Sequence, residues 1–498
     1  MKPHLLRATA LVCMSAAMVV LTTPGQAQQP PAPPLVKQIN NGNWLDPKEA
    51  EQLRDELFYQ RAVYAYMTML PALNTIGMRD GSEATFGKGY NVLPIWKERM
   101  DSRTWIPTPN GDVIYSLTFL DLKQTGPLVV AAPRDVIGMF TDLFQRTITD
   151  VGLIGPDRAR GGLYLLLPPD YDGEVPQGYF AFTSKTYNVM LFFRTVMGKG
   201  ATAPDPKAAV ALAEQTRIYP LWASEKDVKP MQFPDGSGKR VNMMYPVDNT
   251  YWSKLKAFVD YEPVSAIDPE LRGVLASIGI VKGQPFNPTA KQQELLKKAV
   301  ETAPRMILAT RQLGRPDARN LYYKDRQYQN QWAGATAEWM QGSYLDVDQR
   351  AGFFQIAFSS ASAMVMRTLG AGSKYPNTFR DSNGEFLNGS NTYKLHLPPN
   401  PPASLFWAVT LYNITDGTMV ETPQLMPSIN SLSEAVAKNA DGSIDLWFGP
   451  SKPADAPDTN FIQTVNGRNF LAAVRLYGTG VSFFDQTWKP DDVVKVKQ

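Results

Sequence analysis

The stretch PNGDVIYS, residues 109–116, places three polar side chains at the start of an expected strand. Pro, Asn and Gly favour a turn, so Asn110 lies in that turn, and Asp112 and Tyr115 enter the strand behind it. A carboxylate beside a phenol can anchor a polar ligand or exchange a proton with it. We therefore take Asp112 and Tyr115 as candidate catalytic residues and Asn110 as a candidate ligand-binding residue. The alternative is structural: Asn110 and Asp112 bond backbone amides in an Asx turn, and Tyr115 packs in the core.

His396 is a third candidate catalytic residue. Period-two alternation in YKLHL places Leu395 and Leu397 on one face of a strand and His396 with Lys394 on the other. An imidazole on a polar face acts as a general base near neutral pH if that face lines a cleft. The alternative is a solvated histidine or one bonded to the backbone. The sequence contains no Gly-x-Ser-x-Gly elbow that would supply a serine nucleophile.

Aromatic residues make up 11% of the chain. Exposed tryptophans on a sheet stack on sugar rings, whereas most aromatic residues at strand spacing fill cores. Trp407 stands among apolar neighbours, so we expect it in a core. Trp488 follows FFDQT and precedes Lys489 and Pro490. We expect Trp488 at a surface or a domain junction and treat it as a candidate ligand-binding residue.

Several familiar cofactor and metal sites are missing from the sequence. It has no P-loop, no dinucleotide glycine fingerprint, no His-Glu-x-x-His and no haem-attachment motif. Residues 381–392 begin like a calcium loop, but Phe386 and Thr392 stand where an EF-hand needs glycine and glutamate. A hairpin turn is favoured there, with an irregular calcium site as the alternative. We expect no metal and no cofactor.

Residues 1–27 predict a secretory signal peptide. Basic residues precede an apolar run from Ala10 to Leu21, and Gly25-Gln26-Ala27 supplies the small residues of a cleavage site. The mature chain would begin near Gln28 and would lack Cys13, the one cysteine of the sequence. We therefore expect a periplasmic or secreted protein without disulfides or thiolate zinc sites.

The charge balance excludes one class of partner. The signal peptide removes two of the 50 basic residues and none of the 47 acidic residues, so the mature chain is nearly neutral. Because nucleic-acid binding needs a concentrated basic face, we exclude it. No later stretch approaches the ~18 consecutive apolar residues of a membrane span, so we expect none. A chain of 498 residues exceeds what one core usually serves, which predicts two or three domains.

The residue pattern predicts helices before and between two β regions. Residues 28–45 contain a proline-rich tether, and Asp46 is the expected N-cap of a helix ending near Pro71. Further helices are expected at 205–217, 251–260, 268–278 and 289–313, with one from Asp348 to Gly370. Strands are expected at 114–122, 128–131, 163–167, 178–182, 392–397, 405–412, 444–448 and 470–477.

Two parts of the chain resemble known bacterial domain families. PNGDVIYSLTFLDLKQTGPLVV, from Pro109, resembles the entry signature of domain of unknown function 1254 (DUF1254), although Val113 stands where that signature normally has threonine. LDVDQRAGFF, FRDSNGEFLNGSNTYKLHLPPNPPASLFWAVTLYN, NADGSIDLWFGP and VRLYGTGVSFFDQTWKP resemble its usual partner, DUF1214. The resemblance implies two jelly-roll-like antiparallel β-sandwiches with helices between them, and it implies little about activity.

The expected fold is therefore mainly β with a helical insert (α+β). We assign residues 46–200 to a helix and the first sandwich (DUF1254), 201–345 to a helical linking region, and 346–498 to a helix and the second sandwich (DUF1214). The leading functional hypothesis is an exported protein that binds, and processes if it is an enzyme, a carbohydrate or similar polar small molecule. The alternatives are a non-catalytic structural protein that forms homo-oligomers, and a cofactor-free hydrolase or lyase that uses carboxylates and His396.

The signal-peptide prediction can be tested directly. We expect the protein isolated after export to begin near Gln28, because signal peptidase cleaves after small residues such as Ala27. Intact-mass spectrometry of the exported protein measures this. An exported protein that retains residues 1–27 would contradict the prediction.

Overall fold

The computed structural model describes residues 43–313 and 320–496. The predicted signal peptide and residues 28–42 of the predicted tether lie outside these ranges. The chain divides into two units, residues 1–54 and residues 55–498. In the first unit the carboxylate of Asp46 accepts the N–H of Lys48 at 2.9 Å, which caps a helix where the sequence predicts one to begin. The elements described below lie in residues 55–498, apart from the first turns of that helix.

The first helix, α1 (Pro47–Phe86), continues past Pro71, so the predicted end at this proline is wrong. A proline inside a helix removes one hydrogen bond and costs roughly 3 kcal/mol. Residues 72–78 are all buried. The side chain of Asn74 also donates to the carbonyl oxygens of Phe354 and Ala357 at 2.8 and 3.2 Å. Burial of this stretch and its hydrogen bonds therefore outweigh the cost of the proline.

Two four-stranded sheets, with strand orders β2-β8-β4-β5 and β7-β6-β3-β9, form the N-terminal β region. The strands are β2 (Val113–Asp121), β3 (Leu128–Ala132), β4 (Ile137–Asp142), β5 (Thr147–Val151), β6 (Gly162–Leu167), β7 (Phe180–Thr183), β8 (Asn188–Val196) and β9 (Arg217–Pro220). Their pairs are antiparallel, apart from the parallel pair of β6 and β7. One buried cluster joins Val130 and Leu166 of one sheet to Phe140 and Leu191 of the other.

The C-terminal β region also has two sheets that share a core. The strands are β13 (Ser373–Lys374), β14 (Asn377–Thr378), β15 (Tyr393–Leu397), β16 (Ala403–Asn413), β17 (Ser428–Asn430), β18 (Ile444–Gly449), β19 (Phe461–Gln463), β20 (Phe470–Thr479) and β21 (Val494–Lys495). Their orders are β13-β20-β16-β17, with β14 also on β20, and β19-β18-β15-β21. Val409 and Val474 of the first sheet pack with Leu395 and Leu446 of the second. The chain thus contains both helices and strands, and the strands form several antiparallel sheets, as predicted.

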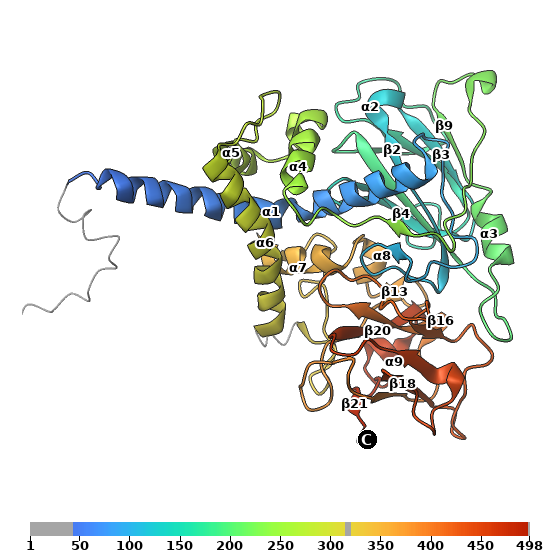
Figure 1. Ribbon diagram of the computed structural model, residues 1–498. Coiled ribbons are helices and arrows are strands. Elements are labelled where there is room, and N and C mark those ends of the chain that lie inside the picture. The colour runs from blue at the N-terminus through green and yellow to red at the C-terminus, as the bar shows by residue number, and fades with distance from the viewer. Residues whose placement is uncertain (1–42, 314–319, 497–498) are drawn as a thin grey trace, which may run out of the picture. The chain divides into compact units, whose positions relative to one another are not determined.

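Further helices pack beside and between these regions. They are α3 (Lys207–Ala213), α4 (Thr250–Tyr261), α5 (Pro269–Ser277), α6 (Ala290–Leu313), α7 (Val347–Ile356) and α8 (Ser362–Val365), with the short α2 (Leu122–Thr125) and α9 (Val481–Phe484) at strand ends. In Figure 1, α7 and α8 lie between the strands of the two β regions. Over residues 43–313 and 320–496, no helix is both long and apolar enough to cross a bilayer.

The single helix predicted from Asp348 to Gly370 is instead two helices. Asp346, not Asp348, caps α7, because its carboxylate accepts the N–H of Gln349 at 3.0 Å. The chain then leaves the helical conformation at Ala357, and Ser359 has a positive φ of 59°. The side chain of Gln145, on a loop of the N-terminal β region, accepts the N–H of Ser359 at 2.5 Å. A tertiary hydrogen bond therefore fixes the break between α7 and α8.

Two further predictions from the sequence differ from the structure: the end of one helix and the number of strands in the N-terminal β region. The helix predicted at 205–217 ends at Ala213, and Arg217 instead begins β9. The strands β4, β5 and β8 lie within the predicted β region, but the residue pattern did not single them out. β8 is the central partner of both β2 and β4, so the longest strand pairing of this sheet could not be drawn from the sequence.

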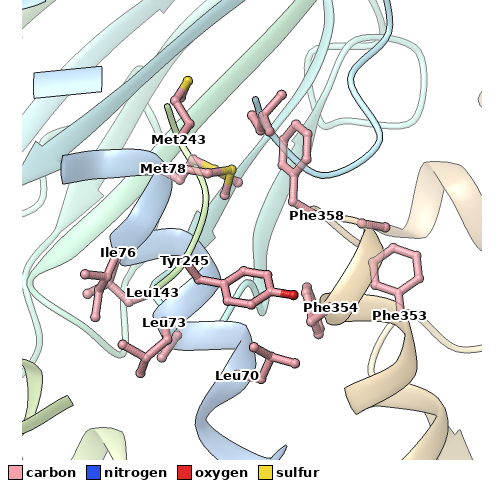
Figure 2. Packing of buried hydrophobic residues seen from close by; sticks show 14 of the residues in the cluster. Leu70, Leu73, Ile76, Met78, Leu143, Met243, Tyr245, Phe353, Phe354 and Phe358 are labelled. Atoms are coloured by element: carbon pink, nitrogen blue, oxygen red, sulfur yellow. The ribbon is translucent and has the colours of Figure 1, made fainter. Parts of the chain in front are cut away.

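A central apolar cluster joins α1, α4, α5, α6 and α7 to β2 and β8 on one side and to Phe406 and Tyr477 on the other. Figure 2 shows Leu70 and Leu73 of α1 across from Phe354 of α7, with Tyr245 between the two helices. The Tyr245 hydroxyl donates to the carbonyl oxygen of Gln355 at 2.8 Å. The helical layer and the two β regions therefore share one packed centre.

Close packing of α1 gives a test of this arrangement. A Cβ at Gly81 would lie 1.9 Å from the carbonyl oxygen of Asn242, in β10 (Val241–Asn242), which pairs with β1 (Thr104–Trp105). We expect Gly81→Ala to lower the free energy of unfolding by about 1–3 kcal/mol, because the strand backbone must shift. Chemical denaturation of the purified protein measures the effect.

Gly273 in α5 is the matched control. A Cβ there meets no atom within 4 Å. Gly273→Ala should therefore raise the free energy of unfolding by up to about 1 kcal/mol, the ordinary gain of alanine over glycine in a helix. Equal effects of the two substitutions would contradict the close contact between α1 and β10.

Candidate functional site

Two buried arginines, one from each β region, line the same part of the molecule. Arg194 of β8 is 3% exposed and Arg475 of β20 is 5% exposed. Their strand neighbours Phe193 and Val474 belong to the cores inside the two pairs of sheets. Because side chains alternate along a strand, Arg194 and Arg475 project from the other face of each sheet, away from the core between the paired sheets and toward the helices.

Within the described ranges, neither arginine forms an ion pair with a carboxylate. Arg194 Nη1 donates to the hydroxyl of Tyr375 at 3.3 Å. Arg475 donates to the hydroxyl of Thr410 at 3.3 Å and to the carbonyl oxygen of Thr108 at 3.4 Å. The Nε of each arginine is buried without a hydrogen-bond partner, and within the described ranges no carboxylate oxygen lies within 4.0 Å of either guanidinium. Such burial costs several kcal/mol per ion, so the place is prepared for a negative charge.

Both arginines line one cavity of about 60 Å³, which we call the junction cavity. Its apolar wall includes Phe192, Trp332, Phe353 and Phe358. The polar residues that line it are Thr108, Asn110, Tyr115, Arg194, Gln331, Ser359, Tyr375, Asn377, Arg475 and Tyr477. Phe358 reaches the cavity because the chain is extended between α7 and α8, so the break in the predicted helix shapes the site.

Three tyrosines surround the arginines and differ in acidity. Burial raises the pKa of Tyr115 to about 12, although the nearby arginines act against the shift. Burial also raises the pKa of Tyr477 well above its ordinary value. For Tyr375, burial raises the pKa, but Arg194, hydrogen bonds from Ser373 and Tyr477, and Arg475 together outweigh it, so its pKa lies below 10.0. Tyr375 is therefore the most acidic phenol of the three.

Asn110 and Asp112 form hydrogen bonds that fix the start of β2. The side-chain oxygen of Asn110 accepts the N–H of Asp112 at 2.7 Å, which is the Asx turn, and its amide donates to the Tyr477 hydroxyl at 2.7 Å. The fully buried carboxylate of Asp112 accepts from Arg99 at 2.9 Å, Asn430 at 2.7 Å and Ser428 at 2.8 Å. With both oxygens occupied, Asp112 ties β2 to β17 and is not placed to take a proton from a ligand.

His396 and Trp488 lie elsewhere. His396 Nδ1 is 2.7 Å from Asp445 Oδ1, and Lys394 Nζ is 3.3 Å from the other oxygen of that carboxylate. Burial raises the pKa of Asp445, but the hydrogen bonds and charge of these two neighbours lower it by a larger amount. The pKa of Asp445 therefore lies below its ordinary value. Trp488 is 5% exposed, belongs to the core between the C-terminal sheets and donates to Pro398 at 3.2 Å. Neither residue lines the junction cavity.

Comparison with known families assigns the two β regions. The family model "Protein of unknown function (DUF1254)" matches residues 90–220, and "Protein of unknown function (DUF1214)" matches residues 372–481. The chain combines a DUF1254 region with a DUF1214 region. The order of the two regions is the one expected from the sequence. Asn110, Tyr115 and Arg194 belong to the DUF1254 region, and Tyr375, Arg475 and Tyr477 to the DUF1214 region, so both regions are needed to complete the junction cavity.

Two solved structures are similar to the chain. The VPA0106 protein from Vibrio parahaemolyticus has a TM-score of 0.52 and 19% identity, over 88% of this chain and 100% of that chain. An uncharacterised protein from Burkholderia cenocepacia has a TM-score of 0.40 and 13% identity, over 92% of each chain. No curated protein matches the chain. The likeness to the Vibrio protein shows a shared fold alone.

Sequence analysis found Asn110 and Tyr115 but missed both arginines. A usable signal was present: NVMLFFRTV and FLAAVRLYGT each carry one charge inside an otherwise apolar or small-residue strand. Charged residues are rarely fully buried unless paired. A lone arginine in each of two buried strands therefore marks a candidate site. Across residues 43–313 and 320–496, no three His, Cys, Asp or Glu side chains gather where they could hold a metal ion.

The unpaired charges predict an unusual mutational effect. Replacing Arg194 or Arg475 with methionine should raise the free energy of unfolding by about 1–4 kcal/mol, because an apolar side chain of similar length removes a buried unpaired charge. Urea denaturation of each variant measures the change.

Arg99→Met is the contrasting variant in the same region. It removes the ion-pair partner of Asp112 and leaves a buried carboxylate uncompensated. We expect it to lower the free energy of unfolding by about 3–5 kcal/mol. If Arg194→Met and Arg475→Met are as destabilising as Arg99→Met, the two arginines have countercharges and the description of the site is wrong.

Proposed function

We propose that the chain binds small molecules through an anionic group, a carboxylate or comparable oxyanion, held between Arg194 and Arg475 in the junction cavity. The observation that carries the proposal is the pair of buried guanidinium groups that face one cavity without a carboxylate partner. A bound anion supplies the missing countercharge. Guanidinium groups also match the planar, bidentate geometry of carboxylates and oxyanions.

The size of the cavity limits which of the polar small molecules expected from the sequence can bind. A cavity of about 150 Å³ in another protein accommodates benzene, whereas the junction cavity measures about 60 Å³. A complete sugar ring is therefore too large for it. Small carboxylates such as formate and acetate fit, and a glycan would enter only with an acidic end group. Neutral sugars offer no countercharge to the arginines.

The tyrosines favour the same ligand class. Burial raises the pKa of both Tyr115 and Tyr477, so both keep their hydroxyl protons at neutral pH. The hydroxyl group of Tyr115 is therefore available as a donor on the wall of the cavity, whereas the hydroxyl proton of Tyr477 is directed to Tyr375. The amide of Asn110 already donates to the Tyr477 hydroxyl, which orients that hydroxyl.

The finer predictions of the sequence are part of this proposal. We propose that each pair of sheets is a β-sandwich of the jelly-roll kind, and the shared apolar clusters inside the two pairs support this. We also propose that the mature protein is exported, on the pattern of residues 1–27. The region boundaries near residues 200 and 345 belong to the same proposal. A non-catalytic assembly protein remains the main alternative.

The proposal is tested with matched charged and neutral ligands. Isothermal titration in a buffer free of small oxyanions should detect binding of acetate but not of acetamide, which has the same shape without the charge. Arg194→Met and Arg475→Met should each weaken acetate binding about 10- to 100-fold, since each removes a charged hydrogen-bond donor.

Arg134→Met is the control for this experiment. Its side chain is 73% exposed and lies in an ion pair with Asp135 at the surface. This variant should bind acetate as the unmodified protein does. Equal binding of acetate and acetamide, or unchanged acetate binding in both Arg194→Met and Arg475→Met, would overturn the proposal.

A further inference from the structure

Building on the proposed anion site, we propose that Tyr375 is its proton-exchanging group. Above the pKa of Tyr375, the phenolate of this residue is the countercharge of Arg194 and Arg475 in the empty junction cavity, whereas below that pKa the phenol is neutral and the arginines have no countercharge. When an anion binds above that pKa, Tyr375 takes up one proton and the anion replaces it as countercharge.

The contacts of Tyr375 support a phenolate. Its hydroxyl oxygen accepts from Arg194 Nη1 at 3.3 Å and is hydrogen-bonded to the Ser373 hydroxyl. The guanidinium carbon of Arg475 lies 6.0 Å from the centre of its ring, and the Tyr477 ring stands edge-on at 6.3 Å. An oxygen that accepts several hydrogen bonds next to positive charge favours its deprotonated form.

Other titratable groups lie near the Tyr375 hydroxyl. From β2 and β20 come Tyr115 and Tyr477, whose pKa values are both raised by burial, and a phenolate on Tyr375 raises them further. The partly buried Tyr322 also faces Tyr375, and burial raises its pKa too. One phenolate, on Tyr375, is therefore the expected ionised form.

One carboxylate also acts on this region. Asp150 of β5 faces the same side of its sheet as Arg194 but forms no ion pair with it within 4.0 Å. Burial raises the pKa of Asp150 to about 6, and Arg194 opposes that shift. Asp150 therefore titrates at a lower pH than an ordinary phenol. The Tyr375→Phe variant described below keeps Asp150 and separates the effects of the two groups.

The exchange is balanced in charge and protons. A ligand that arrives as an anion binds while Tyr375 takes a proton from solvent. A ligand that arrives as a neutral acid breaks its own O–H bond, the proton forms the O–H of Tyr375, and the carboxylate remains between the arginines. No oxidant or cofactor is required. Tyr375 is thus placed to act as a general base toward a bound acid.

This coupling fixes the direction of the pH dependence. Below the pKa of Tyr375 the phenol is already neutral, so acetate binds with constant affinity. Above that pKa a proton must be taken up with each anion, and the affinity falls tenfold per pH unit. Since the pKa of Tyr375 is lower than the ordinary value of 10.0, the fall begins below pH 10.

The first experiment titrates the full-length protein without ligand. Near-ultraviolet absorbance should show one phenolate that forms below pH 10 and is missing from Tyr375→Phe. Tyr344→Phe is the control, because Tyr344 is 56% exposed and away from the cavity. That variant should keep the early phenolate. An unchanged titration in Tyr375→Phe would overturn the inference.

The second experiment measures acetate binding from pH 7 to pH 10 by isothermal titration in two buffers with different ionisation heats. The unmodified protein should bind more weakly as pH rises and should take up close to one proton per acetate above the pKa of Tyr375. Tyr375→Phe should bind acetate equally well across this range. Constant affinity in the unmodified protein would overturn the inference and leave the proposed function standing.

A third variant covers the case in which Tyr375→Phe does not fold. Ser373→Ala removes one hydrogen bond to the Tyr375 oxygen. It should raise the midpoint of the phenolate titration and shift the fall in acetate affinity upward by the same amount. A shift in only one of the two would overturn the coupling. If the early phenolate is present but acetate binds at no pH, the proposed function fails, and the coupling fails with it.

Discussion

The structure depends on two positive charges, Arg194 and Arg475, that are buried where the DUF1254 and DUF1214 regions meet. Burying an ion without a partner is costly, and no carboxylate within the described ranges forms an ion pair with either. The surrounding phenols moderate the cost, since hydroxyl groups accept and donate hydrogen bonds. A protein that keeps this arrangement gives up stability at one place, which is the usual sign of a site that holds a ligand.

The rest of the chain fixes the position of these charges. The central apolar cluster packs α1 and the helical layer against both β regions, so the two sheets that carry the arginines cannot drift apart without exposing it. Asp112 crosses the same boundary through Ser428 and Asn430, and Asn110 crosses it through Tyr477. The cavity therefore exists only while both regions are folded and joined, which gives a physical reason for their presence in one chain.

Local pattern predicted the elements whose apolar faces are regular in the sequence. The alternation at residues 393–397 correctly gave buried Leu395 and Leu397 with His396 on the more polar face. It did not show which part of the molecule that face meets. The continuation of α1 past Pro71 and the break after α7 were not predicted, because both depend on contacts between distant residues. Asn74 donates to a carbonyl oxygen 280 residues away, and Gln145 accepts from Ser359 across 214 residues. The pairing of Arg194 with Tyr375 is likewise a contact between distant strands.

The central claim is that the junction cavity is an anion site, and anomalous diffraction from crystals soaked in bromide tests it most directly. Bromide is a small anion whose position is seen without assumptions about its hydrogen bonds. The account predicts an anomalous peak inside the cavity, between the guanidinium groups of Arg194 and Arg475. Bromide found only at surface positions, with none in the cavity, would contradict it.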